Sequence, residues 1–130
     1  MADTPQPIGV AIVERDGRYL VGRRGTEGPL PGYDEFPGGK CQANEPPQAC
    51  AERECLEETG LTVIAERLLL RRQFEYAHDR VDLHFWLCRP TQERQIADGH
   101  HGFRWLDADA LGGCRFPQAN SPVIALLLAK

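Results

Sequence analysis

The chain has 130 residues, of which 42% are hydrophobic and 26% are charged, as in an ordinary soluble globular protein; we expect one domain over residues 1–130. Its net charge of −4 argues against a nucleic acid polymer as partner, because polymer phosphates are bound through basic surfaces. No apolar run approaches the roughly 18 residues of a membrane span, and the opening MADTPQP lacks a basic and apolar leader. We therefore expect a cytoplasmic monomer without a membrane partner.

The first half of the chain predicts strands followed by a loop. Two short runs, Ile8–Val13 and Arg18–Gly22, flank a turn at Arg15-Asp16-Gly17 and read as neighbouring strands. Residues 25–32 are rich in glycine and proline, which indicates a loop with defined bends. In the following Phe36-Pro37-Gly38-Gly39 run, the two glycines permit backbone shapes closed to other residues.

A helix is predicted next, followed by more strands. Pro46-Pro47 suits a first helical turn, good helix formers fill Gln48–Glu58, and Gly60 is a natural stop. The later strand candidates are Leu61–Leu70, Gln73–Tyr76, Val81–Cys88 as a central strand, and Phe103–Leu106.

The C-terminal part predicts a polar loop and a second helix. Residues 89–102 read as a variable loop, and Ala108–Leu111 as a turn or single helical turn. Ser121 is expected to cap an apolar helix whose first turn holds Pro122. Strands interleaved with two helices favour an α/β sandwich with a central mixed β-sheet.

Five cysteines, at positions 41, 50, 55, 88 and 114, show neither a CxxC pair nor zinc-ligand spacing. We expect reduced thiols that mostly behave as small buried hydrophobes.

The most informative segment is the run Gly39–Leu61, in which Glu54, Glu57 and Glu58 crowd together. On a helix these carboxylates share one face and repel each other, whereas Arg53 and Glu57 are spaced for an ion pair. A divalent cation held by these carboxylates and by glycine carbonyls would relieve the repulsion, and oxygen ligands suit Mg²⁺ or Mn²⁺. A solvated acidic helix face is the alternative.

The spacing of Gly39, Glu45, Arg53-Glu54, Glu57-Glu58 and Gly60-Leu61 resembles the Nudix box, with Cys55 where that family usually has an aliphatic residue. The resemblance implies a Nudix-type α/β/α sandwich and a metal-dependent hydrolase of nucleoside diphosphate linkages. It places the metal ligands on Glu54, Glu57, Glu58 and the Gly38 carbonyl, and makes Glu54 the general base. Gly39, Glu45 and Gly60 take the structural positions of the box, and Arg53 belongs to its catalytic run.

One position departs from the family pattern. A metal-binding glutamate usually stands six residues before the tryptophan that corresponds to Trp105, but this chain has Gly99 there. Asp98 or a neighbouring histidine is a candidate replacement. Otherwise, the helix carboxylates act alone.

Three further segments, EFPGGK, DLHFWL and FPQANSPVIAL, resemble the MutT branch of the family, which hydrolyses 8-oxo-dGTP to the monophosphate and pyrophosphate. That branch's base-reading asparagine falls on Asn120. An asparagine amide offers a donor and an acceptor, which matches the N7–H and O6 of 8-oxoguanine but not the two acceptors of guanine. The alternative is a loop asparagine that stabilises its own turn.

Weaker assignments complete the expected substrate site. Phe36 matches a base-contacting phenylalanine of the branch, although it would equally suit the core. Arg24 matches a nucleotide-contacting arginine, with a merely solvated side chain as the alternative. Tyr76 and Arg80 are placed near the pocket by the same resemblance.

Three functions follow from this sequence. The leading one is a Mg²⁺-dependent 8-oxo-dGTP diphosphatase. The second keeps the Nudix chemistry with a pyrimidine triphosphate or a nucleotide sugar as substrate. The third is a non-catalytic nucleotide-binding module. In each, the partner is a small nucleotide.

Overall fold

The computed structural model describes residues 4–26, 30–76, 79–91 and 102–129. Its strands are β1 (Gln6–Arg15), β2 (Arg18–Arg23), β3 (Asp34–Glu35), β4 (Gly38–Lys40), β5 (Val63–Glu75), β6 (Arg80–Pro90) and β7 (Arg104–Asp107). Its helical elements are α1 (Pro47–Thr59), α2 (Ala108–Leu111), a 3₁₀ turn η2 (Gln118–Asn120) and α3 (Ser121–Leu128). None of these described helices is long and apolar enough to cross a membrane.

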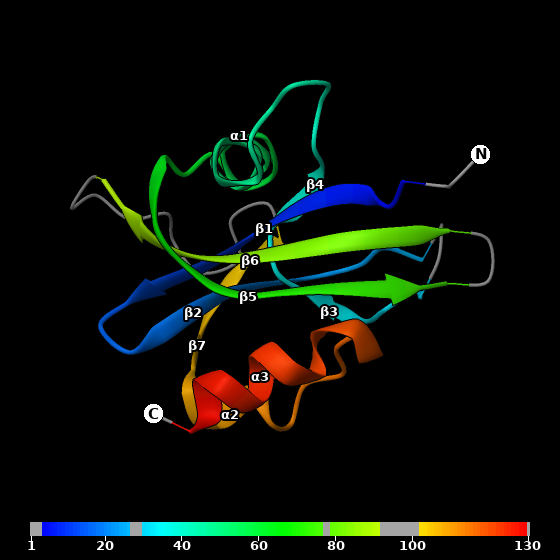
Figure 1. Cartoon of the computed structure of the whole chain (residues 1–130). Helices are drawn as coiled ribbons and strands as arrows, with labels where there is room; N and C mark the ends of the chain where they lie inside the picture. Colours follow the sequence, from blue (N-terminus) through cyan, green and yellow to red (C-terminus); the bar gives the residue numbers. More distant parts are fainter. Residues whose placement is uncertain (1–3, 27–29, 77–78, 92–101, 130) are drawn as a thin grey trace.

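The strands form a mixed sheet that lies between two helical layers. Helix α1 covers one face, and α2 and α3 cover the other (Figure 1). Along the sheet the order is β3-β2-β1-β6-β5, with β4 added to β1 and β7 added to β2. Strands β1 and β6 are parallel, whereas the other pairs are antiparallel. The predicted α/β sandwich with a mixed sheet is therefore confirmed.

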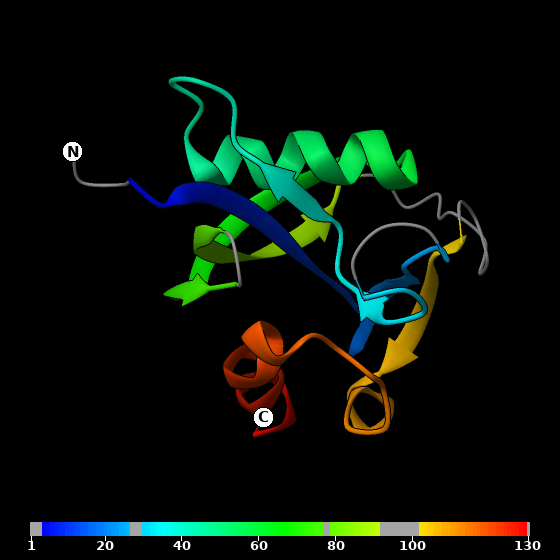
Figure 2. The same ribbon diagram turned by 90° about the vertical axis from the view of Figure 1, so that its right-hand side faces the viewer.

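Two strands, β4 and β2, pair with the same edge of strand β1. Ile8–Val10 pair with β4, whereas Glu14 and Arg15 pair with β2 through the predicted tight turn. In that turn Asp16 and Gly17 both have positive φ, as hairpin turns of this type require. Figure 2 shows β4 beside the first half of β1, below helix α1. The glycine pair of β4 is thereby held directly under the acidic helix.

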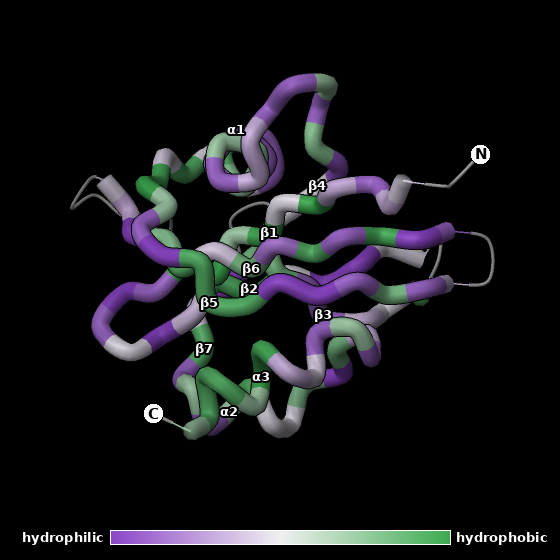
Figure 3. Tube along the Cα trace, viewed as in Figure 1, coloured by the Kyte–Doolittle hydropathy of each residue, from purple (hydrophilic) through white to green (hydrophobic). Residues whose placement is uncertain are grey.

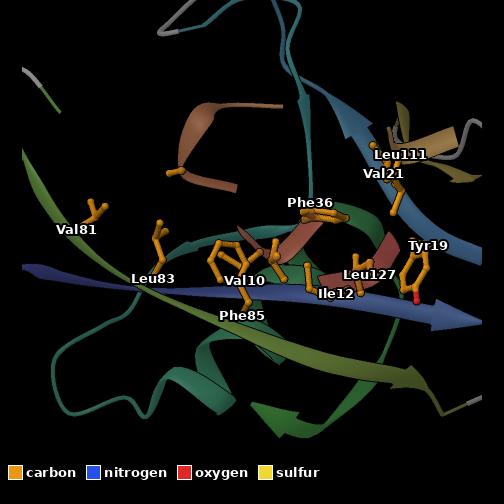
Figure 4. Packing of buried hydrophobic residues seen from close by; sticks show 12 residues of the cluster. Val10, Ile12, Tyr19, Val21, Phe36, Val81, Leu83, Phe85, Leu111 and Leu127 are labelled. Atoms are coloured by element: carbon orange, nitrogen blue, oxygen red, sulfur yellow. The ribbon is translucent and has the colours of Figure 1, made fainter. Parts of the chain in front are cut away.

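Side chains on β1 and β6 alternate between two apolar layers, as the strand period dictates. Val10, Ile12 and Phe85 face α3, where Val123 and Leu127 complete the larger cluster (Figure 4). The smaller cluster on the other face contains Ala11, Val13, Cys88, and Ala51 and Cys55 of α1. Ala51 and Cys55 are fully buried, so the apolar flank of the acidic helix faces the sheet. Coloured by hydropathy, the chain shows apolar segments at the middle of the sheet and along α3 (Figure 3).

Three local details differ from what the sequence suggested. The segments Leu61–Leu70 and Gln73–Tyr76 belong to one strand, β5, because Arg71 and Arg72 between them also pair with β6. Ser121 is the first residue of α3 and not its cap; Asn120, at the end of the 3₁₀ turn, holds the cap position. Gly38 and Gly39 lie in a strand without positive φ.

Asp34 joins β3 to two distant segments of the chain. Its side chain is 5% exposed and accepts a hydrogen bond from Arg104 of β7 at 2.9 Å. It also accepts the backbone N–H of Arg115 at 2.8 Å. Burial alone raises the pKa of this carboxyl, but these hydrogen bonds and the charges of Arg104 and Arg23 outweigh burial and hold the pKa below its usual value. Asp34 thus anchors the segment that leads to Asn120.

Replacing Asp34 by Asn should lower the free energy of unfolding by about 3 kcal/mol at pH 7, because Arg104 is left without its buried partner. Because the folded-state pKa is lowered, the contribution of Asp34 is present above the unfolded pKa of roughly 4 and is lost as the pH falls. The difference between wild type and variant should therefore shrink towards pH 3 in urea unfolding followed by circular dichroism. Asp107→Asn, which breaks an exposed ion pair with Arg18, is the control. A loss of equal size at both pH values would contradict this role.

Candidate active site

Arg53 connects the start of helix α1 to the segment that precedes it. Its Nε and Nη2 donate to the two carboxylate oxygens of Glu45 at 2.8 and 3.0 Å. Its Nη1 donates to Glu54 and to Glu57, each at 3.0 Å, and Nη2 also donates to the carbonyl of Lys40 at 3.1 Å. The hydrogen bonds from Arg53 lower the pKa of Glu45 to about 2. The expected Arg53–Glu57 pair is present, within a larger network.

Glu54 and Glu58 form the inner part of the acidic cluster, against the glycines of β4. A Cβ added at Gly39 would lie 2.5 Å from the Glu54 carboxyl carbon, so any other residue there would force that carboxylate to shift. Burial raises the pKa of Glu58 well above its usual range, and the hydrogen bond and charge of Glu54 raise it further, while the N–H of Gly38 partly opposes them. Because the two carboxylates lie close together, the ionised form of one disfavours ionisation of the other.

Glu57 lies apart from that pair. Its side chain is 58% exposed and is turned towards Arg53. Among the described residues, no group of three His, Cys, Asp or Glu side chains is placed to hold a metal ion. The helix thus brings together Glu54 and Glu58 with the Gly38 backbone, while Glu57 stands at the rim. Two crowded carboxylates beside backbone oxygen atoms are still the donors that suit a hard divalent cation.

A cavity of about 260 Å³ opens beside the same two glycines. Four of the expected substrate residues line it, and they come from four separate segments: Arg24, Phe36, Tyr76 and Asn120. Gly38 and Gly39 line it as well, so the glycine pair borders both the cavity and the carboxylates. Apolar side chains from β1 and β6 complete the walls, namely Ile8, Val10, Val81 and Leu83.

Phe36 belongs to the core and to the cavity at once. It is 6% exposed, and its ring stacks on Phe116 with centroids 4.7 Å apart. Both interpretations of this residue therefore describe its position.

Asn120 reaches the cavity from the end of the 3₁₀ turn. Although it holds the cap position of α3, its side chain makes no capping hydrogen bond. The helix therefore does not use this amide.

The structure places one predicted site residue, Arg80, elsewhere, and it does not describe Asp98. Arg80 is not among the described residues that line the cavity; its Nε lies 3.4 Å from Glu75. Asp98 and Gly99 lie outside the described residues.

Glu35 lines the cavity, although the sequence analysis did not single it out as a site residue. It lies 3.7 Å from Arg24, and burial raises its pKa although Arg24 opposes the shift. The sequence signal that could have identified Glu35 as a site residue was its position in the EFPGGK run.

Comparison with known proteins places this geometry in a family. A family model described as the NUDIX domain matches residues 9–126. The 8-oxo-dGTP diphosphatase of Escherichia coli K12 is 32% identical over 122 residues, which cover 92% of this chain and 94% of that protein. The CTP pyrophosphohydrolase of the same organism is 26% identical over 119 residues, covering 92% and 88%. In fold, the MutT protein structure from Methanosarcina mazei Go1 has a TM-score of 0.79 at 20% identity, covering 98% of this chain and 96% of that one.

The fold and the acidic helix define a phosphoanhydride hydrolase of the α/β sandwich class. The chain belongs to the NUDIX family and is a Nudix hydrolase that acts on pyrophosphate bonds. Hydrolases of this family generally require a divalent metal.

Replacing Gly39 by Ala should reduce turnover by roughly 100-fold, because the added Cβ displaces the Glu54 carboxylate from its position. The fold should persist, since Ala is tolerated where φ is negative, and circular dichroism would check this. Steady-state rates of pyrophosphate-bond hydrolysis measure the effect. Gly113→Ala is the matched control, because its Cβ would meet only ordinary contacts. Wild-type turnover of the Gly39 variant would contradict the importance of this close contact.

Proposed function

We propose that this hydrolase cleaves 8-oxo-dGTP to 8-oxo-dGMP and pyrophosphate, with Mg²⁺ as cofactor and Mn²⁺ as a substitute. The observation that carries the proposal is the cavity in which Arg24, Phe36, Tyr76 and Asn120 meet beside Gly38 and Gly39. Its volume of about 260 Å³ suits part of a nucleotide and not the whole, since pockets for complete drug-sized ligands start near 300 Å³. The similarity to an 8-oxo-dGTP diphosphatase supports the same assignment.

Base selection is assigned to Asn120. Its amide presents a donor and an acceptor to the base edge, and 8-oxoguanine offers O6 as an acceptor and N7–H as a donor. Guanine carries acceptors at both positions, so one of them would face the amide carbonyl. In a buried site this mismatch costs about 1–3 kcal/mol. Phe36 supplies an apolar surface for the ring, and Arg24 a cation at the cavity wall.

We place the phosphates of the substrate on the side of Gly38 and Gly39 that faces the carboxylates of helix α1. There the Gly38 carbonyl, Glu54 and Glu58 would hold the divalent cation, which neutralises phosphate charge and helps to orient the attacking water. Glu57 is close enough along the helix to join them from the rim. Glu54, fixed between Arg53 and Gly39, takes the proton from the attacking water.

A second candidate substrate is a pyrimidine triphosphate such as CTP. The 26% identity to a CTP pyrophosphohydrolase over most of both chains supports it. Both candidates use the same acidic helix, and they differ only in what the cavity selects.

Replacing Asn120 by Ala should lower kcat/KM for 8-oxo-dGTP by roughly 10- to 100-fold, while the rate for dGTP changes little. The preference for the oxidised base should therefore disappear. Pyrophosphate release is measured across 8-oxo-dGTP, dGTP, dCTP, CTP and ADP-ribose, with Mg²⁺ and then Mn²⁺. Gln73→Ala, an exposed residue of β5 that lines neither this cavity nor the adjoining one, is the control. Equal or better wild-type turnover of dCTP, CTP or ADP-ribose would refute the proposed substrate.

Replacing Glu54 by Gln should abolish turnover, by at least about 1,000-fold, because the variant loses both a metal-binding oxygen and the proton acceptor. Removing divalent metal with EDTA should have the same effect on the wild type, and added Mg²⁺ should restore activity. Glu66→Gln, an exposed substitution on β5, should leave the rate unchanged. Metal-independent turnover, or an active Glu54 variant, would rule out this arrangement.

A further inference from the structure

Cys41 and Cys50 lie opposite each other where β4 meets helix α1. The N–H of Cys41 bonds to the carbonyl of Pro7 at 2.9 Å, which continues the β1–β4 ladder one residue beyond the strand. Cys41 therefore projects to the same face as Gly39, two residues earlier. On α1, Cys50 shares a face with Glu54, four residues later.

The spacing of the two elements brings these residues into register. Two residues of strand advance about 6.6 Å, and four residues of helix advance about 6 Å. Glu54 lies against Gly39, the chain reverses between the elements, and the Cys50 thiol reaches the Gly39 carbonyl, so the register places Cys50 beside Cys41. In agreement, each thiol affects the pKa of the other: Cys50 lowers that of Cys41, and Cys41 raises that of Cys50.

The surroundings of the pair belong to the catalytic framework. The Cys50 thiol donates to the Gly39 carbonyl at 3.3 Å and lies 4.0 Å from Nη2 of Arg53. Cys50 is fully buried, whereas Cys41 is partly exposed and is open to a small reagent. Burial raises the pKa of both thiols. Because the thiolate is the reactive form, oxidation of this pair should become faster as the pH rises above neutral.

We propose that Cys41 and Cys50 are an oxidation site whose reversible disulfide switches off hydrolysis. Hydrogen peroxide oxidises the accessible Cys41 thiol to a sulfenic acid and is itself reduced to water. The Cys50 sulfur then attacks the Cys41 sulfur, the S–O bond breaks, and a second water leaves with the Cys50 proton. Two thiols thus supply the two electrons that reduce one peroxide. A dithiol reductant reverses the step by exchange.

Loss of activity follows from the geometry. A disulfide brings the two sulfurs to about 2 Å, so the end of β4 moves towards α1, and the Gly39 carbonyl loses the Cys50 proton donor. Because Gly39 has no free space against Glu54, a small shift of β4 displaces the carboxylate that the reaction needs. The bond also closes a loop between residues 41 and 50, which should raise the melting temperature while turnover falls.

The disulfide is tested by mass spectrometry of the whole protein treated with hydrogen peroxide, alkylated with iodoacetamide and digested with trypsin. Trypsin cuts after Lys40 and after Arg53, so one peptide carries both cysteines. We expect an unalkylated peptide lighter by two hydrogens after peroxide, and a doubly alkylated peptide after dithiothreitol. A peptide that keeps two alkylatable thiols, while other cysteines oxidise, would overturn the proposal.

The switch is tested by turnover of the best substrate, before and after peroxide. The wild type should lose at least tenfold and recover with dithiothreitol, whereas Cys41→Ser should keep its activity in peroxide. Cys114→Ser, which removes a different partly exposed thiol, should respond like the wild type. A disulfide without loss of turnover, or loss in Cys41→Ser as well, would overturn the switch. The proposal rests on hydrolase activity and not on the identity of the base; failure of the proposed substrate would leave the peptide result unaffected.

Discussion

The close packing of helix α1 against β4 is the constraint on which the rest of the site depends. Two glycines leave space for it: a Cβ at Gly9 would meet the backbone of Pro47 and Ala51 at 2.7 Å, and a Cβ at Gly39 would meet the Glu54 carboxylate. The part of β4 that carries Gly38 and Gly39 is held in turn by the ladder to β1. A backbone segment is therefore pressed between the central strand and a row of carboxylates. This arrangement brings backbone oxygen and carboxylate oxygen within reach of the same small volume.

The balance of charge explains why the space between β4 and the carboxylates of α1 favours a cation. Arg53 is the cation that contacts Glu45, Glu54 and Glu57 together, so its single positive charge is shared among three carboxylates. Glu58 lies deeper, beside Glu54; burial raises its pKa, and the hydrogen bond and charge of Glu54 raise it further. A divalent cation bound at the proposed site would supply positive charge there, while Arg53 contacts the outer oxygens of Glu45, Glu54 and Glu57. The same repulsion among the carboxylates thus explains both the network around Arg53 and the proposed affinity of the site for a metal ion.

Local patterns predicted the elements of the fold better than the details at their ends. Helix α1, the β1–β2 hairpin and β6 follow from periodicity and from turn residues, which act over a few positions. The continuity of β5 was missed because Arg71 and Arg72 are held in the strand by their pairing with β6 and not by local composition. The cap of α3 was misplaced because the preceding 3₁₀ turn already directs the chain into the helix. The reason for Gly39 was also misjudged: it is space and not backbone angle, which only the neighbouring helix reveals.

The two halves of the site differ in how far sequence can specify them. The acidic half lies in one continuous segment, so the spacing of Arg53, Glu54 and Glu58 determines their relation before any tertiary contact forms. The cavity is assembled from β1, β6, the segment before β4, and the turn that carries Asn120. Its shape depends on remote contacts such as that of Asp34 with Arg115. Changes in those distant segments can alter the selected base without touching the carboxylates. Relatives that share the acidic helix can for this reason act on different nucleotides, and the substrate must be argued from the cavity.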